Sequence, residues 1–219
     1  MKRIVLVFIL IVAGLTGGIY ASLPTDVPPL QDGDLVFQTL LDSRSRTVIV
    51  ATGSLYAHMG IIKKSGPQTV VIEAIGPVKE TDYDQWVKRG LLRRVAIFRD
   101  RNLTPKQSED ILTAAKNFYG RPYDIFFSFN NEAIYCSELA YLTYKNAGLS
   151  IGKLQKVSDL HADNFLVKKL IERRWRRDPE CRGYDFEQCY RHILDQKLIT
   201  PVSIARDPQL TKIYSNYPF

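Results

Sequence analysis

The sequence predicts an α+β fold in which an antiparallel sheet packs against helices. Two strand-like runs, Ala57–Ile62 and Thr69–Ala74, are joined by a short segment with the composition of a hairpin turn, which indicates antiparallel pairing. Farther along, Thr104, Pro105 and Gln107 form a strong helix-start signal before an amphipathic run. A chain of 219 residues can bury one substantial core. We therefore expect a single α+β domain.

The first residues have the composition of an export signal. Residues 1–21 contain Lys2 and Arg3, then an apolar run, then several small residues. We expect this segment to be either a signal peptide or a membrane anchor, and residues 22–30 to be a proline-rich linker before a domain over residues 31–219. The domain is therefore expected to be exported, and to be periplasmic or anchored to the inner membrane facing outward. Because no cysteine follows the apolar run, a lipid anchor on such a residue is excluded.

The remaining elements are predicted from capping residues and from the spacing of apolar positions. A turn and a short strand are expected at Gly33–Phe37, and residues 43–54 are interpreted as helix, although their β-branched residues also suit a strand. The other expected elements are a helix from Thr81 or Asp82 to Arg89, a strand at Arg93–Arg99, a helix from Thr104 to Gly120, a helix from Cys136 to Ala147 and a helix from Asp159 or Asn164 to Trp175.

The predicted hairpin sets two polar residues against each other. If the turn is centred between Ser65 and Gly66, strand residues whose numbers sum to 131 are paired, and His58 then lies directly opposite Glu73. Their Cβ atoms would be roughly 5 Å apart on one face of the sheet. Both strands are otherwise apolar, so each polar side chain needs a partner when it is buried. A structural salt link is the alternative to a catalytic pair.

Cys136 is a candidate nucleophile because it lies at the predicted start of a helix. Unpaired backbone N–H groups and the partial positive charge at a helix N-terminus favour a thiolate and can hold an oxyanion. A buried cysteine more often acts as a small apolar filler, which is the competing interpretation. A cysteine hydrolase also needs an imidazole and a polar group that orients it, and the chain offers His58 and Glu73 in those types. His161 and His192 lie in a charged region and are interpreted as surface residues.

Several short motifs, taken in order, resemble one known family. They are Gly33–Gln38, Ala57–Gly60, Val71–Ala74 with Gly76–Val78, Trp86, Gly120–Asp124 and Tyr135–Glu138. Together they resemble the YiiX/YebB-like group, the circularly permuted branch of the NlpC-type papain-like cysteine hydrolases. The resemblance covers residues 33–148 and resumes weakly over residues 200–219. Each motif is weak alone, whereas their joint order and spacing are specific.

The resemblance implies a circularly permuted papain-like fold with Cys136 as nucleophile, His58 as base and Glu73 as the orienting residue. It also implies that Tyr123 contributes to the oxyanion site or the substrate cleft, with a packed tyrosine as the alternative, and Tyr56 is expected to line the same cleft. No metal or cofactor is expected. The implied reaction is hydrolysis of a peptide or wall-peptide amide. Lipid acyl or amide chemistry is an alternative, and a ligand-binding module without catalysis is a second one.

The chain departs from the family over about residues 172–199, where a segment is interpreted as an insert. If the protein is exported, Cys181 and Cys189 are expected to form a disulfide, because they are close neighbours and no CxxC pattern or histidine cluster supports metal binding. The net charge of +7 is concentrated partly in this region. Its basic run is interpreted either as a solvated helix or as a contact to an anionic membrane surface, whereas export disfavours nucleic acid. The run consists of Arg173, Arg174, Trp175, Arg176 and Arg177.

Overall fold

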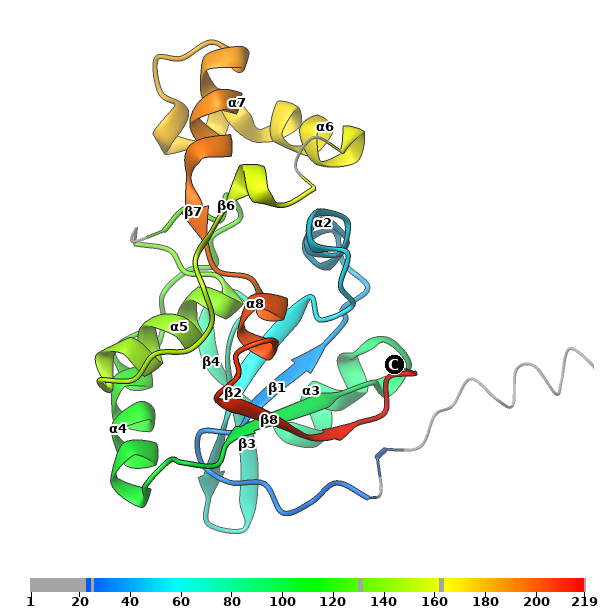
Figure 1. The fold of residues 1–219 in the computed structure, drawn as a ribbon, viewed down its shortest axis with the longest axis vertical. Coiled ribbons are helices and arrows are strands. Elements are labelled where there is room, and N and C mark those ends of the chain that lie inside the picture. Colours follow the sequence, from blue (N-terminus) through cyan, green and yellow to red (C-terminus); the bar gives the residue numbers. More distant parts are fainter. Residues whose placement is uncertain (1–22, 25, 130–131, 162–163, 219) are drawn as a thin grey trace, which may run out of the picture.

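A six-stranded antiparallel sheet in the order β4-β3-β2-β1-β5-β8 forms the centre of the computed structural model (Figure 1). The structure describes residues 23–24, 26–129, 132–161 and 164–218, so the predicted signal or anchor segment lies outside the described residues. The sheet strands are β1 (Leu35–Gln38), β2 (His58–Ser65), β3 (Gln68–Ala74), β4 (Val78–Asp82), β5 (Ala96–Asp100) and β8 (Leu210–Ser215).

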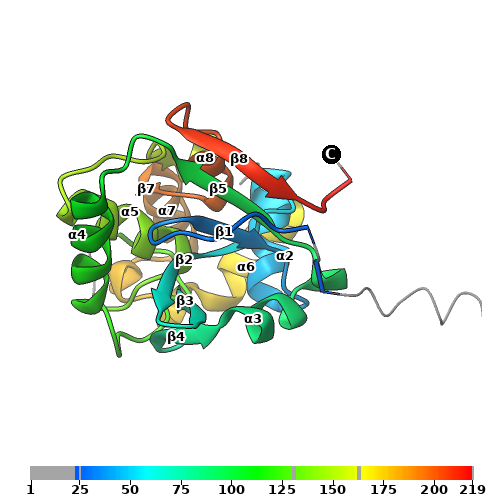
Figure 2. The ribbon, with the colours of Figure 1, turned by 90° about the horizontal axis from the view of Figure 1, so that it is seen from below.

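The two faces of this sheet bury different helices. On one face, Phe37, Met59 and Ile72 belong to a core that includes residues of α4 (Pro105–Lys116), α5 (Cys136–Asn146) and α8 (Pro201–Ala205). On the other face, Val36, Ile62 and Val71 pack with Trp86 and Val87 of α3 (Tyr83–Arg89). This alternation follows from the two-residue period of a strand, which points successive side chains to opposite faces. Figure 2 shows the sheet between α5 and α3.

Local capping explains where several helices begin. In α4, the Thr104 hydroxyl accepts from the Gln107 N–H, and the Gln107 side chain accepts from the Thr104 N–H, as the sequence predicts. The ambiguous segment forms helix α2 (Ser43–Thr52), with Asp42 as N-cap and Gly53 in the left-handed conformation after its end. The cap outweighs the β-branched residues within this helix.

The predicted hairpin register is wrong by two residues. In the structure, β2 and β3 pair Ile61 with Ile72 and Ser65 with Gln68, so the paired numbers sum to 133. Gly66 and Pro67 therefore form the centre of the turn, and Glu73 lies level with Gly60 rather than with His58. A shift by two residues keeps each side chain on its original face, so His58 and Glu73 remain on the same side of the sheet.

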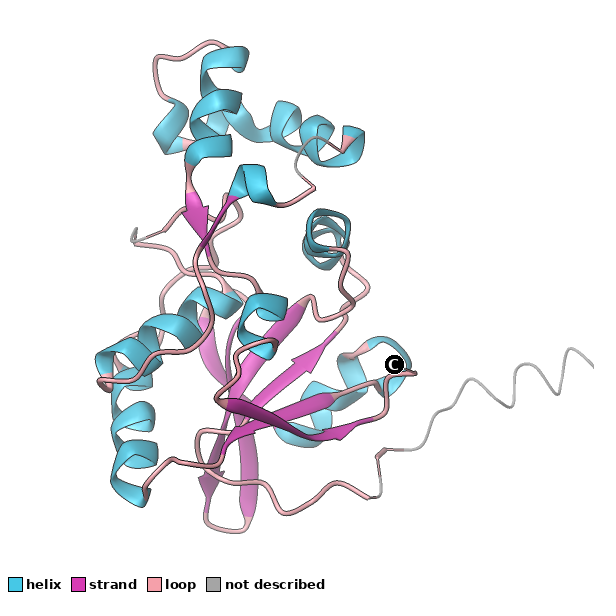
Figure 3. Ribbon diagram, viewed as in Figure 1, coloured by secondary structure: helices cyan, strands magenta, loops and turns pink. Residues whose placement is uncertain are grey.

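A helical cap, residues 155–198, stands on the rest of the fold. We call that remaining part, the six-stranded sheet with α2, α3, α4, α5 and α8, the sheet domain. Its base is the pair of short strands β6 (Gln155–Lys156) and β7 (Lys197–Leu198), visible in Figure 3 as the connection to the helices. Between them lie α6 (Phe165–Arg174), α7 (Phe186–Asp195) and three short 3-10 turns. A disulfide joins Cys181 to Cys189 at the start of α7. The segment predicted to be an insert, about residues 172–199, falls almost entirely in the C-terminal part of this cap.

Within the described residues, no helix combines the length and the apolar character that crossing a membrane requires.

Candidate active site

Cys136 is the first residue of α5, and its side chain is buried. The first hydrogen bond inside the helix runs from the Leu139 N–H to the Tyr135 carbonyl at 2.9 Å. The N–H groups of the helix residues before Leu139 have no carbonyl partner within the helix, because the first N–H groups of an α-helix lack a preceding turn. The Cys136 thiol thus lies beside backbone donors and at the positive end of the helix dipole. This arrangement suits a thiolate nucleophile and a developing oxyanion.

His58 is the first residue of β2 and lies between the thiol and a carboxylate. Its Nε2 is 2.6 Å from Oε2 of Glu73, and the ring also has the Cys136 side chain as a hydrogen-bond partner. Because Nε2 is taken by Glu73, Nδ1 is the nitrogen left for the thiol. Burial lowers the pKa of His58, but the hydrogen bonds and charges of Cys136 and Glu73 outweigh burial and raise the pKa to about 9. The imidazolium form is therefore favoured at neutral pH.

Glu73 is fully buried and accepts hydrogen bonds at both carboxylate oxygens. Oε2 accepts from Nε1 of Trp86 at 3.0 Å and from Arg89 at 2.5 Å, in addition to His58, while Oε1 accepts from the Thr81 hydroxyl at 2.7 Å. Burial raises the pKa of Glu73, but its partners more than reverse this effect and hold the pKa at about 2. The carboxylate is therefore charged and fixed in one orientation.

Gly60 is a residue of the site that the sequence analysis did not identify. A Cβ atom at this position would lie 2.3 Å from Cγ1 of Val71, 2.8 Å from the carbonyl oxygen of Ile72 and 3.5 Å from Cβ of Glu73. The missing side chain therefore allows β3 to approach β2 closely beside Glu73. Gly60 belongs to the motif Ala57–Gly60, but its role follows from the register of β2 and β3.

Tyr123 lies beside the Cys136 thiol, whereas the structure places Tyr56 in an aromatic cluster of the core. The backbones of Tyr123 and Ile134 form an isolated parallel β-bridge. The guanidinium carbon of Arg44 lies 4.7 Å from the centre of the Tyr123 ring. Burial and the neighbouring Cys136 raise the pKa of Tyr123 well above its ordinary value, so the phenol stays protonated and can donate. The ring of Tyr56 instead packs in an aromatic cluster, 5.4 Å from Phe37 and 5.2 Å from Tyr217.

The residues on either side of the nucleophile hold the chain that returns from the cap. The Ser137 hydroxyl donates to the carbonyl of Ile199 at 2.9 Å, and the Ile199 N–H donates to the Tyr135 hydroxyl at 3.1 Å. Both contacts bridge more than sixty residues of sequence. The position of the cap is therefore tied directly to the start of α5. No local sequence signal indicates these contacts.

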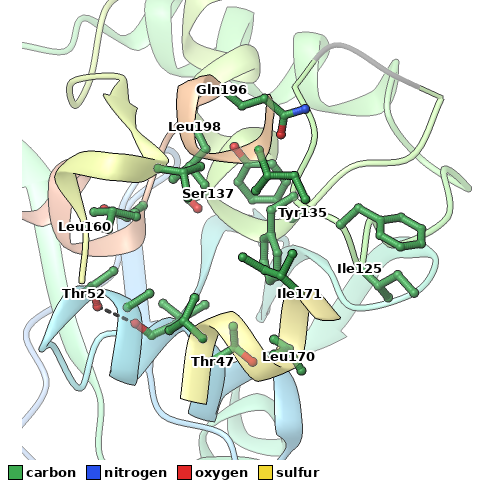
Figure 4. A pocket seen from close by; sticks show the side chains of 18 of the residues that line it. Thr47, Thr52, Ile125, Tyr135, Ser137, Leu160, Leu170, Ile171, Gln196 and Leu198 are labelled. Atoms are coloured by element: carbon green, nitrogen blue, oxygen red, sulfur yellow. Dashed lines mark hydrogen bonds between the residues drawn. The ribbon is translucent and has the colours of Figure 1, made fainter. Parts of the chain in front are cut away.

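An apolar pocket of about 110 Å³ lies between the cap and the sheet domain (Figure 4). Cys136 forms part of its wall. Side chains of α2, α6 and the chain around β7 line it, among them Val48, Val167, Leu170, Ile171, Leu198 and Ile199. Phe127, another wall residue, has a left-handed backbone (φ 60°) and places its ring 5.4 Å from that of Tyr135. The charged residues of its lining are Arg174, which donates to the Ile125 carbonyl at 3.1 Å, and Asp178, whose pKa is raised by burial.

The structure thus brings Cys136, His58, Glu73 and Tyr123 together. His161 is exposed, and His192 lies 3.3 Å from Glu180 within the cap. The predicted basic run is divided, because Arg174 and Trp175 line the pocket while Arg173, Arg176 and Arg177 are exposed.

Comparisons with known proteins point to one family. A family model described as permuted papain-like amidase enzyme, YaeF/YiiX, C92 family, matches residues 29–214. A protein of Escherichia coli strain K12 called uncharacterized protein YiiX is 30% identical over 200 residues, which cover 90% of this chain and 92% of that protein. A solved structure described as the metalloprotein yiiX from Escherichia coli O157:H7 has a TM-score of 0.76 and 30% identity, and the match covers 86% of this chain and 98% of that chain.

The description of that relative as a metalloprotein concerns the relative. In the part of this chain that the structure describes, no group of three or more His, Cys, Asp and Glu residues could hold a metal ion. The described residues therefore offer no donor set that fits a metal site.

Proposed function

This chain belongs to the family of permuted papain-like amidases, YaeF/YiiX, C92, and we propose that it hydrolyses an amide bond through Cys136, His58 and Glu73. The observation that carries the proposal is the position of His58 between the Cys136 thiol and the buried carboxylate of Glu73. A core histidine that served packing alone would not need a charged partner on one nitrogen and a helix-terminal thiol on the other.

The first half of the reaction is acyl transfer to the enzyme. The Cys136 thiolate attacks the carbonyl carbon, a C–S bond forms, and the carbonyl oxygen becomes an oxyanion. The backbone N–H of Cys136 and the Tyr123 hydroxyl are the donors we assign to that oxyanion. The His58 imidazolium then gives its proton to the nitrogen of the leaving amine while the C–N bond breaks. Glu73 keeps the ring of His58 aligned and stabilises its charge throughout.

The second half is hydrolysis of the thioester. The now neutral His58 takes a proton from water, and the resulting hydroxide attacks the acyl carbon. When the C–S bond breaks, the acid leaves and the pair of Cys136 thiolate and His58 imidazolium is restored. Atoms and protons balance without a cofactor.

A specific observation favours an apolar acyl group over a wall peptide. The pocket with Cys136 in its wall is lined mainly by aliphatic side chains, which match a hydrocarbon chain and would leave the polar groups of a peptide without partners. Hydrolysis of a lipid amide or ester is therefore the form of the reaction that we propose first. Cleavage of a wall-peptide amide is the second candidate, and it is supported by the amidase family.

We also propose that the enzyme acts outside the cytoplasm. The composition of residues 1–21 and the disulfide between Cys181 and Cys189 both support export, since disulfides persist in oxidising compartments.

Two measurements test the proposal. Lipid and muropeptide pools incubated with the native chain and with Cys136→Ala are compared by mass spectrometry, and a product that needs Cys136 identifies the substrate. A thiol-reactive acyl probe then separates catalysis from ligand binding, because labelling of Cys136 is expected to slow in His58→Ala. An undiminished labelling rate in that variant would falsify activation by His58 and favour a binding module.

A further inference from the structure

The cap helix α6 has two chemically distinct faces. Its inner face contributes Val167, Leu170 and Ile171 to the apolar pocket. Its outer face begins with two large apolar side chains, Phe165 and Leu166, which are 71% and 59% exposed. In a helix that packs on one side, the opposite face is typically charged or polar, so two adjacent large apolar side chains there depart from the usual amphipathic pattern. The outer face therefore has apolar surface that the rest of the described chain does not cover.

Positive charge surrounds these two residues. The segment from residue 168 to residue 177 contains six Lys and Arg residues and one Glu. Lys169, Arg173, Arg176 and Arg177 are exposed, and none of them forms an ion pair with a carboxylate of the described residues. The Lys169 ammonium lies 5.4 Å from the centre of the Phe165 ring, which brings charge and apolar surface together. We call Phe165, Leu166 and these four cations the docking face.

We propose that the docking face binds the surface of an anionic lipid bilayer. Phe165 and Leu166 enter the boundary between headgroups and acyl chains, while the cations contact lipid phosphates and keep their alkyl stems in the interface. An anionic surface adds about fivefold in affinity for each nearby Lys or Arg. A single protein partner would need a matching acidic groove, whereas a bilayer matches the mixture of protruding apolar and basic side chains without one.

Docking through α6 would also place the apolar pocket near the membrane. Because α6 carries most of the docking face and part of the pocket wall, a docked cap holds the pocket close to the lipid acyl chains. This consequence rests on the proposed lipid substrate, but docking itself does not. A failure of docking and a failure of catalysis are therefore measured separately.

The test uses tryptophan fluorescence of the full chain on vesicles that contain brominated phosphatidylcholine and anionic phosphatidylglycerol. The sequence has two tryptophans. Trp175→Phe removes one of them, and the other, Trp86, is fully buried, so brominated lipid should quench little of the remaining fluorescence. Phe165→Trp then reports contact of the docking face with lipid. Thr113→Trp, at an exposed position of α4 at the other end of the molecule, is the matched probe (Figure 1). Residues 1–21 contain no tryptophan, so their insertion gives no signal.

We expect strong quenching of Phe165→Trp, little quenching of Thr113→Trp, and loss of the Phe165→Trp signal on vesicles of phosphatidylcholine alone. Replacing the four cations of the docking face by Gln is expected to lower the affinity for anionic vesicles at least 100-fold. The matched variant replaces exposed Lys79, Lys88, Arg101 and Lys116 by Gln and should retain the signal. Absence of quenching at residue 165, equal quenching of both probes, or unchanged quenching in the docking-face variant overturns the proposal. Circular dichroism checks that each variant is folded.

Discussion

Oε2 of Glu73 lies 2.6 Å from Nε2 of His58, although the two residues are not opposite each other in the β2–β3 ladder. Gly60 occupies the position level with Glu73, and because it has no side chain, Val71 and Glu73 of β3 approach its backbone closely. The carboxylate therefore reaches His58 diagonally along the same face of the sheet. Diagonal neighbours lie within reach of long side chains, so this contact does not need a direct pair.

The charge of Glu73 is predicted to set the alkaline limit of activity. In the native chain, we expect kcat/KM to fall as pH rises through about 9, where His58 loses its proton. Glu73→Gln removes the carboxylate, so this limit should move to lower pH and the rate at neutral pH should fall roughly 10²- to 10⁴-fold. A pH–rate profile with a defined amide substrate measures both effects. Glu80→Gln, which removes a partly exposed carboxylate on β4, is the control, and an unshifted limit in Glu73→Gln contradicts the assignment.

The same pair predicts how the free energy of unfolding depends on pH. The pKa of Glu73 is lowered from 4.5 to about 2, so its contribution is complete above pH 4.5 and is lost as pH falls toward 2. The pKa of His58 is raised from 6.5 to about 9, so its contribution is complete below pH 6.5 and is lost as pH rises through 9. Maximum stability is therefore expected between these limits, with the loss at low pH on the order of 3 kcal/mol.

Urea denaturation across this pH range measures that profile. Glu73→Gln should be less stable at its centre and should show a flatter curve. If the variant and the native chain lose stability in parallel below pH 4.5, Glu73 is not the responsible group.

Gly60→Ala is predicted to destabilise the sheet beside the site. The added Cβ would meet Cγ1 of Val71 at 2.3 Å and a backbone oxygen at 2.8 Å, and backbone atoms cannot move aside as a flexible side chain can. Overpacking of this kind costs about 1–3 kcal/mol. Thermal and urea unfolding measure the loss, with Ser65→Ala at the exposed end of β2 as the control. Unchanged stability of Gly60→Ala would show that the strands separate easily at this point.

The disulfide is predicted to stabilise the cap more than the sheet domain. Cys181 and Cys189 are eight residues apart, and closing a loop of this length in the unfolded chain contributes about 2.5 kcal/mol. In the double variant Cys181→Ser/Cys189→Ser, we expect faster proteolysis within residues 155–198, whereas cleavage in the sheet domain should change little. Limited proteolysis followed by mass spectrometry locates the cuts. Equal acceleration in both regions would contradict a local role.

Filling the apolar pocket is predicted to select against long acyl chains. Ala51 of α2 lines the pocket, so Ala51→Phe shortens the space available to a hydrocarbon tail. We expect kcat/KM to fall about 10- to 100-fold for long-chain N-acyl amides and to remain unchanged for acetyl amides. Ser43→Phe, an exposed position on the same helix, is the control. An equal loss for short and long chains would indicate damage to the catalytic residues instead of a shortened pocket.

Local signals in the sequence predicted the elements that short-range interactions determine. The Thr104–Gln107 box fixed the start of α4, and Cys136 was correctly placed at the beginning of a helix. The residue types and the order of the motifs indicated the family, which the comparisons confirm. The C-terminal elements α7, α8 and β8 were not predicted, because short amphipathic segments and edge strands carry weak periodicity.

Contacts between distant residues determined the rest. Caps and turns depend on neighbours within a few residues, so the sequence specified them, but the hairpin register also depends on the close approach that Gly60 permits. Three features depend on partners far away in the chain. They are the packing of Tyr56 against Tyr217, the burial of only part of the basic run, and the hydrogen bond from Ser137 to Ile199. The sequence by itself determined the chemical groups of the site and the face of the sheet that carries them. Only the tertiary structure decided how those groups reach each other, because burial and packing are properties of the whole chain.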